Sequence, residues 1–419
     1  MDSATWDQIL DRSPNAAAGA HPGGAVRHGR PRQVLRMTTS LLYFFCGVVL
    51  ILTTQVIGCP LYYMNRPLYY RYMARTKAHF GVLITTVTQW WSPTVIRVTG
   101  DHTVRDQLHK TKDGRVECRF PERLVLIANH QLYSDWLYLW WVAYTARMHG
   151  YIYIILKESL KYIPFLGLGM QFYGFIFMAR KWEQDKPRMQ HRLSKLTANH
   201  GKNPMWLLIF PEGTNLSHNG RVNSKKFADK QGFPDLKHQL LPRSTGLRFC
   251  LEQLKDTVEW VYDCTVAYEG IRRGEYGQDY FTLYSTCIEG RPPKSVNLHW
   301  RRFHVSTIPI SDAKEFDLWL RARWVEKDEL LEYYMQHNRF PEDDTEGSDL
   351  ATVADDKNLR KRVNNVVAKK NVEGSWKGPI ETEVRLAGYL EILDNFIVVI
   401  ATFVAYKLVY AALYRLPFF

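Results

Sequence analysis

Long apolar stretches lie near both ends of this chain, and shorter apolar runs lie between them. Residues 37–65 contain no Asp, Glu, Lys or Arg, and their centre, residues 41–57, is rich in Leu, Ile, Val and Phe. Because about 20 apolar residues cross a bilayer, this stretch predicts a transmembrane helix; a helix buried in the protein core is the alternative. The next uncharged stretch, residues 78–96, contains Trp90, Trp91 and Pro93, which is typical of a helix at a membrane interface.

The C-terminal apolar stretch, residues 396–414, is interrupted by Lys407. It predicts a membrane-associated helix that either spans the bilayer or lies on its surface, with the lysine reaching the polar interface. The preceding residues 341–378 are polar and of mixed charge, which indicates a linker.

Between these ends, short apolar runs alternate with helical patterns. This alternation predicts an α/β fold with a mixed, largely parallel sheet flanked by helices. We expect helices over residues 135–148 and 311–336, and strands over residues 124–128, 151–156, 205–210, 261–268 and 280–286.

Six parts of the chain follow from this pattern. They are a disordered basic arm (1–36), a transmembrane segment (37–65), an interfacial helical segment (66–97), a globular catalytic domain (98–340), a polar linker (341–378) and a C-terminal membrane-associated segment (379–419).

The net charge of +13 favours an anionic partner. The apolar ends already predict contact with an anionic partner, the membrane surface, so we expect no nucleic-acid partner.

The six cysteines form no C-x-x-C pair, which argues against a disulfide framework and a zinc ribbon. Neither a metal-binding H-E-x-x-H motif nor a phosphate-binding G-x-x-x-x-G-K-[ST] loop occurs, so the sequence predicts no metal and no cofactor.

Candidate chemistry begins where the strand at 124–128 meets the helix at 135–148. There the sequence reads Asn129-His130-Gln131-Leu132-Tyr133-Ser134-Asp135. A histidine and an aspartate can form a base and its orienting partner, but on a straight helix a spacing of five residues would point them about 140° apart. The segment must therefore bend between the strand and the helix. A purely structural histidine is the alternative.

A second candidate follows the strand at 205–210, in the sequence Pro211-Glu212-Gly213-Thr214. The glycine allows backbone to approach a ligand, and N–H groups in such a turn can hold an oxyanion or a phosphate. An ordinary strand-ending turn is the alternative.

The two motifs together, Asn-His-x-x-x-x-Asp and Phe-Pro-Glu-Gly-Thr, resemble the glycerolipid acyltransferases of the 1-acylglycerol-3-phosphate acyltransferase type. Further blocks resemble this family, including the branch with lysocardiolipin and lysophosphatidylinositol acyltransferases; they lie at residues 157–167, 174–180, 223–228, 241–246 and 262–268. The resemblance runs from about residue 128 to residue 268, and more loosely to 334.

The resemblance implies transfer of an acyl chain from acyl-CoA, as co-substrate, to the free hydroxyl of a lysophospholipid in a membrane. It implies His130 as general base, Asp135 as its partner, and Glu212, Gly213 and Arg180 as acceptor-binding residues. Backbone N–H groups near Gly213, or Asn129, are the candidates for holding the oxyanion, and Thr214 belongs to the same motif. No obligate protein partner is implied.

One position departs from the family pattern. Arginine commonly follows Glu-Gly-Thr, and here the residue is Asn215, which cannot pair with a phosphate through two charged bonds. Arg180, Lys225 and Arg243 are then the candidate phosphate ligands, and a headgroup larger than that of lysophosphatidic acid becomes plausible.

Three alternatives remain open at this point. The acceptor is lysophosphatidic acid, or lysophosphatidylinositol or lysocardiolipin in a remodelling enzyme. Ser134 can be considered as an acyl-enzyme nucleophile. A catalytically silent lipid-binding protein on the same fold is an alternative of another class. The resemblance implies the endoplasmic reticulum, with mitochondrial membranes as the second location.

Overall fold

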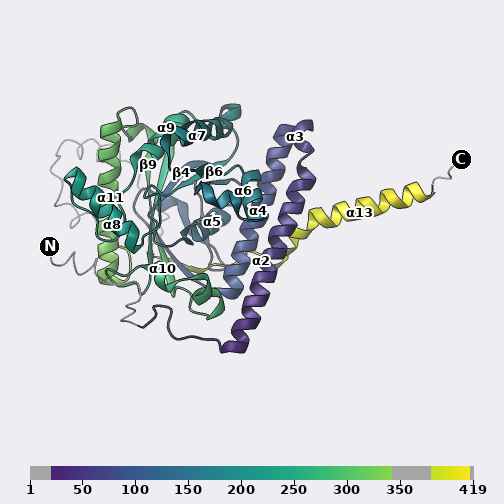
Figure 1. Ribbon diagram of the computed structural model, residues 1–419, viewed down its shortest axis with the longest axis horizontal. Coiled ribbons are helices and arrows are strands. Elements are labelled where there is room, and N and C mark those ends of the chain that lie inside the picture. Colours follow the sequence, from purple (N-terminus) through teal and green to yellow (C-terminus); the bar gives the residue numbers. More distant parts are fainter. Residues whose placement is uncertain (1–19, 342–378, 416–419) are drawn as a thin grey trace.

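The computed structural model describes residues 20–341 and 379–415, and its centre is an eight-stranded sheet with helices on both faces (Figure 1). The strand order is β10-β1-β9-β8-β4-β7-β5-β6. The strands of this sheet are β1 (Val95–Gly100), β4 (Arg123–Ala128), β5 (Ile152–Lys157), β6 (Ile176–Met178), β7 (Met205–Ile209), β8 (Trp260–Tyr268), β9 (Ser295–His304) and β10 (Ile380–Glu383). A small antiparallel pair joins β2 (Leu108–Lys110) and β3 (Val116–Cys118).

The helices follow the strands in alternation through the middle of the chain. The α-helices are α2 (Arg30–Gly58), α3 (Leu61–Met64), α4 (Arg66–Trp91), α5 (Asp135–Thr145), α6 (Leu166–Phe172), α7 (Trp182–Leu196), α8 (His218–Gln231), α9 (Ser244–Leu254), α10 (Gly277–Tyr280), α11 (Ala313–His337) and α13 (Asp394–Arg415). Short 3-10 or π-helical turns are η1 (Arg105–Gln107), η2 (Glu158–Tyr162), η3 (Ala198–Gly201), η4 (Tyr284–Ile288), η5 (Val305–Thr307) and η6 (Tyr389–Leu393).

Five neighbouring strands, β8, β4, β7, β5 and β6, run parallel, whereas β9 pairs antiparallel with β8 and β10 pairs antiparallel with β1. The predicted mixed, largely parallel α/β fold is therefore confirmed. The carboxyl ends of the parallel strands share one edge, which is where ligands usually bind in such sheets.

Alternate residues of the central strand β4 face two separate cores. Leu124 and Leu126 belong to the core beneath α4 and α5, and Val125 and Ile127 belong to the core beneath α7, α9 and α11. A strand buried on both faces reads as a continuous apolar run, which explains why the sequence predicted it correctly. The strands expected at 151–156, 205–210 and 261–268 and the helices expected at 135–148 and 311–336 are also confirmed.

The strand expected at residues 280–286 is wrong, because this segment forms α10 and η4. The Ser285 hydroxyl donates to the carbonyl of Tyr280 and the Thr286 hydroxyl to that of Thr282, so side chains satisfy carbonyls locally instead of leaving them for a ladder. The position beside β8 belongs instead to β9, which the sequence pattern did not predict.

The prediction of a disordered arm over residues 1–36 is wrong for its described part; residues 1–19 lie outside the described residues. The side chain of His21 bonds the carbonyl of Tyr280 at 2.9 Å, and the Arg27 N–H donates to the Glu289 carbonyl at 3.0 Å. Helix α2 then begins at Arg30, seven residues before the predicted apolar segment. The His21 side chain and the Arg27 backbone bond to the domain, and Pro22 and Gly23 are buried against it, so this segment is ordered.

The interfacial helix expected over residues 66–97 is also corrected. Helix α4 ends at Trp91 and β1 starts at Val95. The uncharged half of α4 lies between α2 and the sheet, and Phe80, Leu83 and Ile84 are part of the core. Absence of charge in this stretch reflects burial inside the protein.

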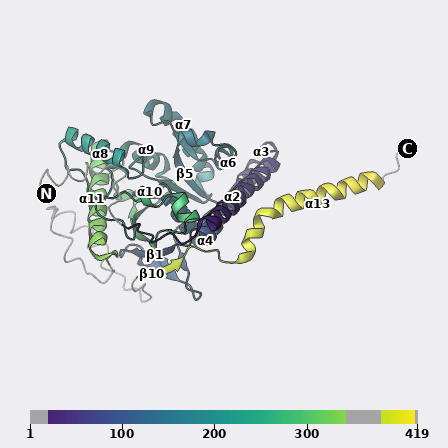
Figure 2. The ribbon, with the colours of Figure 1, turned by 60° about the horizontal axis from the view of Figure 1, so that its bottom comes forward.

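Helices α2 and α4 form an antiparallel hairpin along one side of the domain, as Figures 1 and 2 show. Residues Arg30–Met64 make up the one stretch of the described helices that is long and apolar enough to cross a membrane, and 33% of its most apolar window is buried. The protein contacts α2 near both ends. Arg36 donates to the carbonyls of Cys287 and Trp91, and Gln55 donates to the carbonyl of Gly169.

The C-terminal segment returns to the sheet before it leaves the body. Its strand β10 pairs with β1, and its helix α13 then projects away from the layered domain (Figure 1). Of the expected linker at 341–378, all but the first residue lies outside the described residues. Among the described side chains of α13, large apolar ones are exposed, namely those of Phe396, Ile397, Ile400, Phe403, Val404, Tyr406 and Leu408.

Candidate active site

His130 and Asp135 meet at the carboxyl end of β4. The strand ends at Ala128, helix α5 begins at Asp135, and the turn between them brings Nδ1 of His130 to 2.9 Å from Oδ2 of Asp135. The bend that the five-residue spacing required is therefore present. A carboxylate acceptor at Nδ1 assigns the proton to that nitrogen and leaves Nε2 as the basic atom.

The Asp135 carboxylate is almost completely buried and fully bonded. Its Oδ2 also accepts from the Leu132 N–H at 3.0 Å, and its Oδ1 accepts from the hydroxyl of Tyr268 at the end of β8. Burial, together with the adjacent carboxylate, raises the pKa of Tyr268 well above its usual value. The phenol therefore stays protonated and remains a donor to Asp135.

The ring of His130 is stacked on Phe210, with centroids 4.1 Å apart. Its backbone is held from two sides: the His130 N–H donates to Oε1 of Glu212 at 3.0 Å, and its carbonyl accepts from the Leu216 N–H at 2.7 Å. The imidazole thus has little freedom to turn, while 17% of the side chain remains exposed.

Glu212 is buried beneath the histidine. Its second oxygen accepts from the Leu240 N–H at 3.2 Å, so both carboxylate oxygens face backbone N–H groups. Burial raises the pKa of Glu212 to about 8, against the lowering effect of these two hydrogen bonds. These contacts favour a positioning role for Glu212, where the resemblance implied contact with the acceptor.

Asn129 is fully buried and links β4 to β8. Its amide donates to the Val266 carbonyl at 2.9 Å and accepts from the Val266 N–H at 2.7 Å. Because both amide groups are used between strands, Asn129 is placed as a structural residue and is not free to hold an oxyanion.

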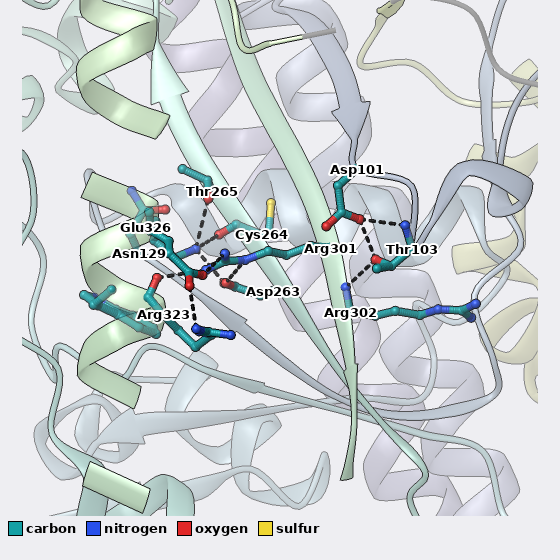
Figure 3. A network of polar contacts seen from close by, with 12 residues as sticks. Asp101, Thr103, Asn129, Asp263, Cys264, Thr265, Arg301, Arg302, Arg323 and Glu326 are labelled. Atoms are coloured by element: carbon teal, nitrogen blue, oxygen red, sulfur yellow. Dashed lines mark hydrogen bonds and ion pairs between the residues drawn. The ribbon is translucent and has the colours of Figure 1, made fainter. Parts of the chain in front are cut away.

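A buried ionic network lies next to Asn129 (Figure 3). Asp263 on β8 accepts from Arg301 on β9 at 2.8 Å and from Lys327 on α11, and Lys327 also donates to the Cys264 carbonyl at 2.7 Å. These paired charges fasten α11 to the back of the strand that carries Tyr268.

Arg180 and Arg243 both lie close to Gly213. The guanidinium of Arg180 donates to the Gly213 carbonyl at 2.6 Å. Gly213 has a φ of 74°, and a Cβ there would lie 3.7 Å from Cδ of Arg243. Two of the three predicted phosphate ligands are therefore brought to the loop that follows β7.

Asp185, in the first turn of α7, fixes the backbone around Arg180. Its fully buried carboxylate accepts from the N–H groups of Ala179 at 2.7 Å and Lys181 at 3.0 Å. Arg180 between them has a φ of 64°, a conformation that is unfavourable for a residue with a side chain. The two bonds hold this conformation and so direct Arg180 towards Gly213.

The remaining predicted residues are placed differently. Lys225 lies on α8 and bonds Asp229 one turn away at 3.2 Å, so the structure does not bring it to Gly213. Asn215 donates to Gln278 at 2.6 Å and ties the loop to α10. The Gly213 N–H donates to the Phe210 carbonyl at 3.0 Å and is thus used within the turn. Thr214 is half-buried beside it.

Two residues that position the site were not assigned from the sequence. Tyr268 is the last residue of β8 and of the segment 262–268, which resembles the family. A tyrosine at the carboxyl end of a parallel strand was the available signal. Asp185 carried no signal, because its role depends on the backbone conformation of Arg180. In the described part of the chain, no group of three or more His, Cys, Asp or Glu side chains could hold a metal ion.

Comparison with known proteins shows to which family this chain is similar. Residues 95–269 match the family model described as "Acyltransferase", and residues 286–362 match "Acyltransferase C-terminus". The 2-acyl-1-lysophosphatidylinositol acyltransferase of Saccharomyces cerevisiae is 38% identical, over 74% of this chain and 87% of the relative. An uncharacterised acyltransferase of Schizosaccharomyces pombe is 40% identical, over 74% of this chain and 88% of the relative. Lysocardiolipin acyltransferase 1 of Gallus gallus is 36% identical, over 51% of this chain and 54% of the relative. The chain belongs to the acyltransferase family that includes lysophospholipid acyltransferases.

Proposed function

We propose that this protein transfers an acyl chain from acyl-CoA to the free hydroxyl of a lysophospholipid at a membrane. The observation that carries the proposal is the His130–Asp135 contact at the carboxyl end of β4, with Nε2 of the imidazole left as the base. Nε2 takes the proton of the acceptor hydroxyl while that oxygen attacks the thioester carbonyl. The carbon–sulfur bond then breaks, and the thiolate of CoA recovers the proton from the imidazolium.

Asp135 stabilises the imidazolium that forms during transfer, because its carboxylate already faces Nδ1. Thr214 is the candidate for holding the oxyanion. Within the described chain its N–H and its hydroxyl donate no hydrogen bond, so both are free to bind a developing charge. An acyl-enzyme on Ser134 is the weaker route, since the Ser134 hydroxyl makes no hydrogen bond to His130 among the described residues.

Arg180 and Arg243 bind the phosphate of the acceptor in this proposal. Both lie close to Gly213, and Asn215, where the family often has arginine, donates to Gln278. Lysophosphatidylinositol is the second candidate for the acceptor. The yeast relative named for it matches about three quarters of this chain. Asn215 is also smaller than the arginine that is common at this position, which leaves room for a headgroup larger than that of lysophosphatidic acid.

Membrane attachment is proposed through two surfaces. The outer side of α2 exposes Leu41, Leu42 and Phe45, and the protein covers its other side and contacts both ends. This arrangement favours a helix half-immersed along the bilayer surface rather than a span. Helix α13 is the second surface, and its apolar part Phe396–Leu408 extends about 20 Å at roughly 1.5 Å per residue. This is shorter than the hydrocarbon core of about 30 Å, so α13 is proposed to insert into the bilayer without crossing it. The endoplasmic reticulum is the proposed location, and mitochondrial membranes are the alternative.

The test is acyl transfer from one acyl-CoA to a panel of lysophospholipids by the full-length protein in membranes, with release of CoA measured in parallel. We expect CoA release only when a lysophospholipid is present, and a release lowered by about 10²–10⁴ in His130→Ala. A folded wild-type protein that transfers to none of the acceptors would support the silent lipid-binding alternative.

A further inference from the structure

A polar hollow lies apart from the catalytic dyad, beside the edge strand β6. Its volume is about 280 Å³. It is formed where η2, α6, β6 and α7 meet, and its lining residues are Glu158, Lys161, Gln171, Phe175, Ile176, Phe177, Arg188, His191 and Arg192. None of these residues takes part in the acyl transfer described above.

Cations outnumber carboxylates in this hollow. Glu158 alone accepts from Lys161 at 2.6 Å and from Arg188 at 2.8 Å, so one negative charge serves two positive ones. Arg192, one turn further along α7, makes no hydrogen bond or ion pair with the described part of the chain. A half-buried guanidinium has five donors in a fixed geometry and is therefore well suited to an anionic ligand.

The surroundings add to the positive charge. Partial burial and the charges of Arg192 and Arg66 lower the pKa of Lys195. The start of α4 thus contributes a further cation to the same end of α7. Such an accumulation of like charge is stabilised when an anion binds.

Phe175 and Phe177 add aromatic side chains to the lining of the hollow. Its volume is just below the roughly 300–1,000 Å³ that is usual for small-molecule sites. The hollow therefore fits one charged and aromatic end of a ligand rather than a whole ligand.

The position of the hollow relates it to the dyad. The strands β4, β7, β5 and β6 are parallel neighbours, so β6 lies three strand spacings from β4, on the order of 14 Å. Helix α7 connects the two regions: Asp185 in its first turn fixes Arg180, and Arg188 and Arg192 follow on later turns. A long co-substrate that reacts at the carboxyl end of β4 can thus reach the hollow with its far end.

We propose that the hollow bounded by Lys161, Arg188 and Arg192 binds a phosphate monoester, namely the 3′-phosphate at the adenosine end of acyl-CoA. This inference rests on the proposed function. The same chemistry is also offered by the phosphate monoester of an anionic lipid headgroup such as phosphatidic acid, and the experiment must separate these two sources.

The first experiment measures KM for acyl-CoA and for the matching acyl-3′-dephospho-CoA, with lysophospholipid in excess. We expect the wild-type protein to require about tenfold more of the dephosphorylated donor, the scale of one charge-assisted contact. Arg188→Ala and Arg192→Ala should bring this ratio close to one. Lys186→Ala is the matched control, because Lys186 lies exposed on the same helix outside the hollow and should keep the wild-type ratio.

The second experiment does not depend on turnover. Titration calorimetry with adenosine 3′,5′-bisphosphate should show binding to the wild-type protein and to His130→Ala, and loss of that binding in Arg192→Ala. Failure of acyl transfer with intact bisphosphate binding would refute the proposed function and leave the site in place.

One outcome would assign the phosphate to a membrane lipid instead of acyl-CoA, and another would show that the hollow binds no phosphate. Acyl transfer is also measured with and without vesicles that contain phosphatidic acid. If the KM ratio of the two donors is unchanged in Arg192→Ala, but the vesicles stimulate the wild-type protein and not this variant, the phosphate site binds a membrane lipid. If the donor ratio, the bisphosphate binding and the vesicle response are all unchanged in both arginine variants, the inference is overturned.

Discussion

The hydroxyl of Tyr268 donates a hydrogen bond to Oδ1 of Asp135, the oxygen that His130 leaves free. These two residues lie 133 positions apart in the chain and meet because β4 and β8 are parallel neighbours. The tyrosine thus completes the hydrogen bonding of a carboxylate that is otherwise buried, and it fixes the plane in which Asp135 meets the imidazole.

Replacing Tyr268 by Phe should lower kcat about tenfold while KM for lysophospholipid changes little. The carboxylate would keep its charge but lose one orienting bond, which costs about 1–3 kcal/mol for a buried acceptor. Steady-state kinetics check this. Tyr138→Phe is the control, because Tyr138 is buried near Tyr268, with ring centroids 6.1 Å apart, and does not bond Asp135. Equal losses in both variants would indicate a general packing effect.

Removal of the base itself should have a larger effect. We expect His130→Ala to lower turnover by about 10²–10⁴, the contribution of proton transfer by a positioned side chain. Asp135→Asn should also impair turnover, because an amide cannot stabilise an imidazolium. Both variants should still bind acyl-CoA, as equilibrium dialysis would show. Near-wild-type turnover by a folded His130→Ala protein would remove this histidine from the mechanism.

Arg180 should be important mainly for acceptor binding. Arg180→Ala is expected to raise KM for lysophospholipid about tenfold or more, since a charge-assisted hydrogen bond contributes about 1.5–3 kcal/mol. Lys181→Ala, at the adjacent exposed position, should leave that KM unchanged. The same comparison with a neutral monoacylglycerol as acceptor should show no difference between Arg180→Ala and wild type, because no phosphate is then present.

Asp185 should act through Arg180. Asp185→Asn retains the shape but weakens the two bonds to the N–H groups of Ala179 and Lys181, so Arg180 should lose its fixed direction. We expect KM for lysophospholipid to rise, and no further rise when Arg180→Ala is added. Additive effects of the two substitutions in a double-mutant cycle would contradict the positioning role.

Glu212 should make stability depend on pH. Its pKa is raised to about 8 in the folded protein, against 4.5 as its ordinary value, so between these values the folded state binds more protons than the unfolded state. Its contribution to the free energy of unfolding therefore falls as pH rises from 4.5 to about 8 and stays low above that. Thermal unfolding between pH 6 and 8 should show a steeper fall for wild type than for Glu212→Gln. Parallel curves for the two proteins would contradict the assignment.

Membrane retention should depend on both α13 and α2. Deletion of residues 394–419 should increase release by an alkaline carbonate wash, because the apolar run is then lost from the bilayer. Phe45→Glu on the exposed side of α2 should weaken binding to a smaller extent. Complete release of the full-length protein by the wash would exclude a span in either helix.

The sequence by itself determined the parts of the fold whose signal is local. The buried runs at β4, β7 and β8 are properties of short segments, and they predicted the α/β class. The spacing of His130 and Asp135 made them candidates for a dyad, and the resemblance of two motifs to a known family implied their roles. The composition of residues 37–65 likewise identified an apolar helix, although its start at Arg30 depended on contacts of polar residues with the domain.

Only the tertiary structure decided which partners these segments meet. Burial of α4 under α2, the use of the Asn129 amide between strands, and the separation of Lys225 from Gly213 all result from packing between distant parts of the chain. The same holds for the contacts of Tyr268 and Asp185. A hydrogen bond or an apolar contact between distant residues depends on their arrangement in space, and the sheet that sets this arrangement joins strands far apart in the sequence.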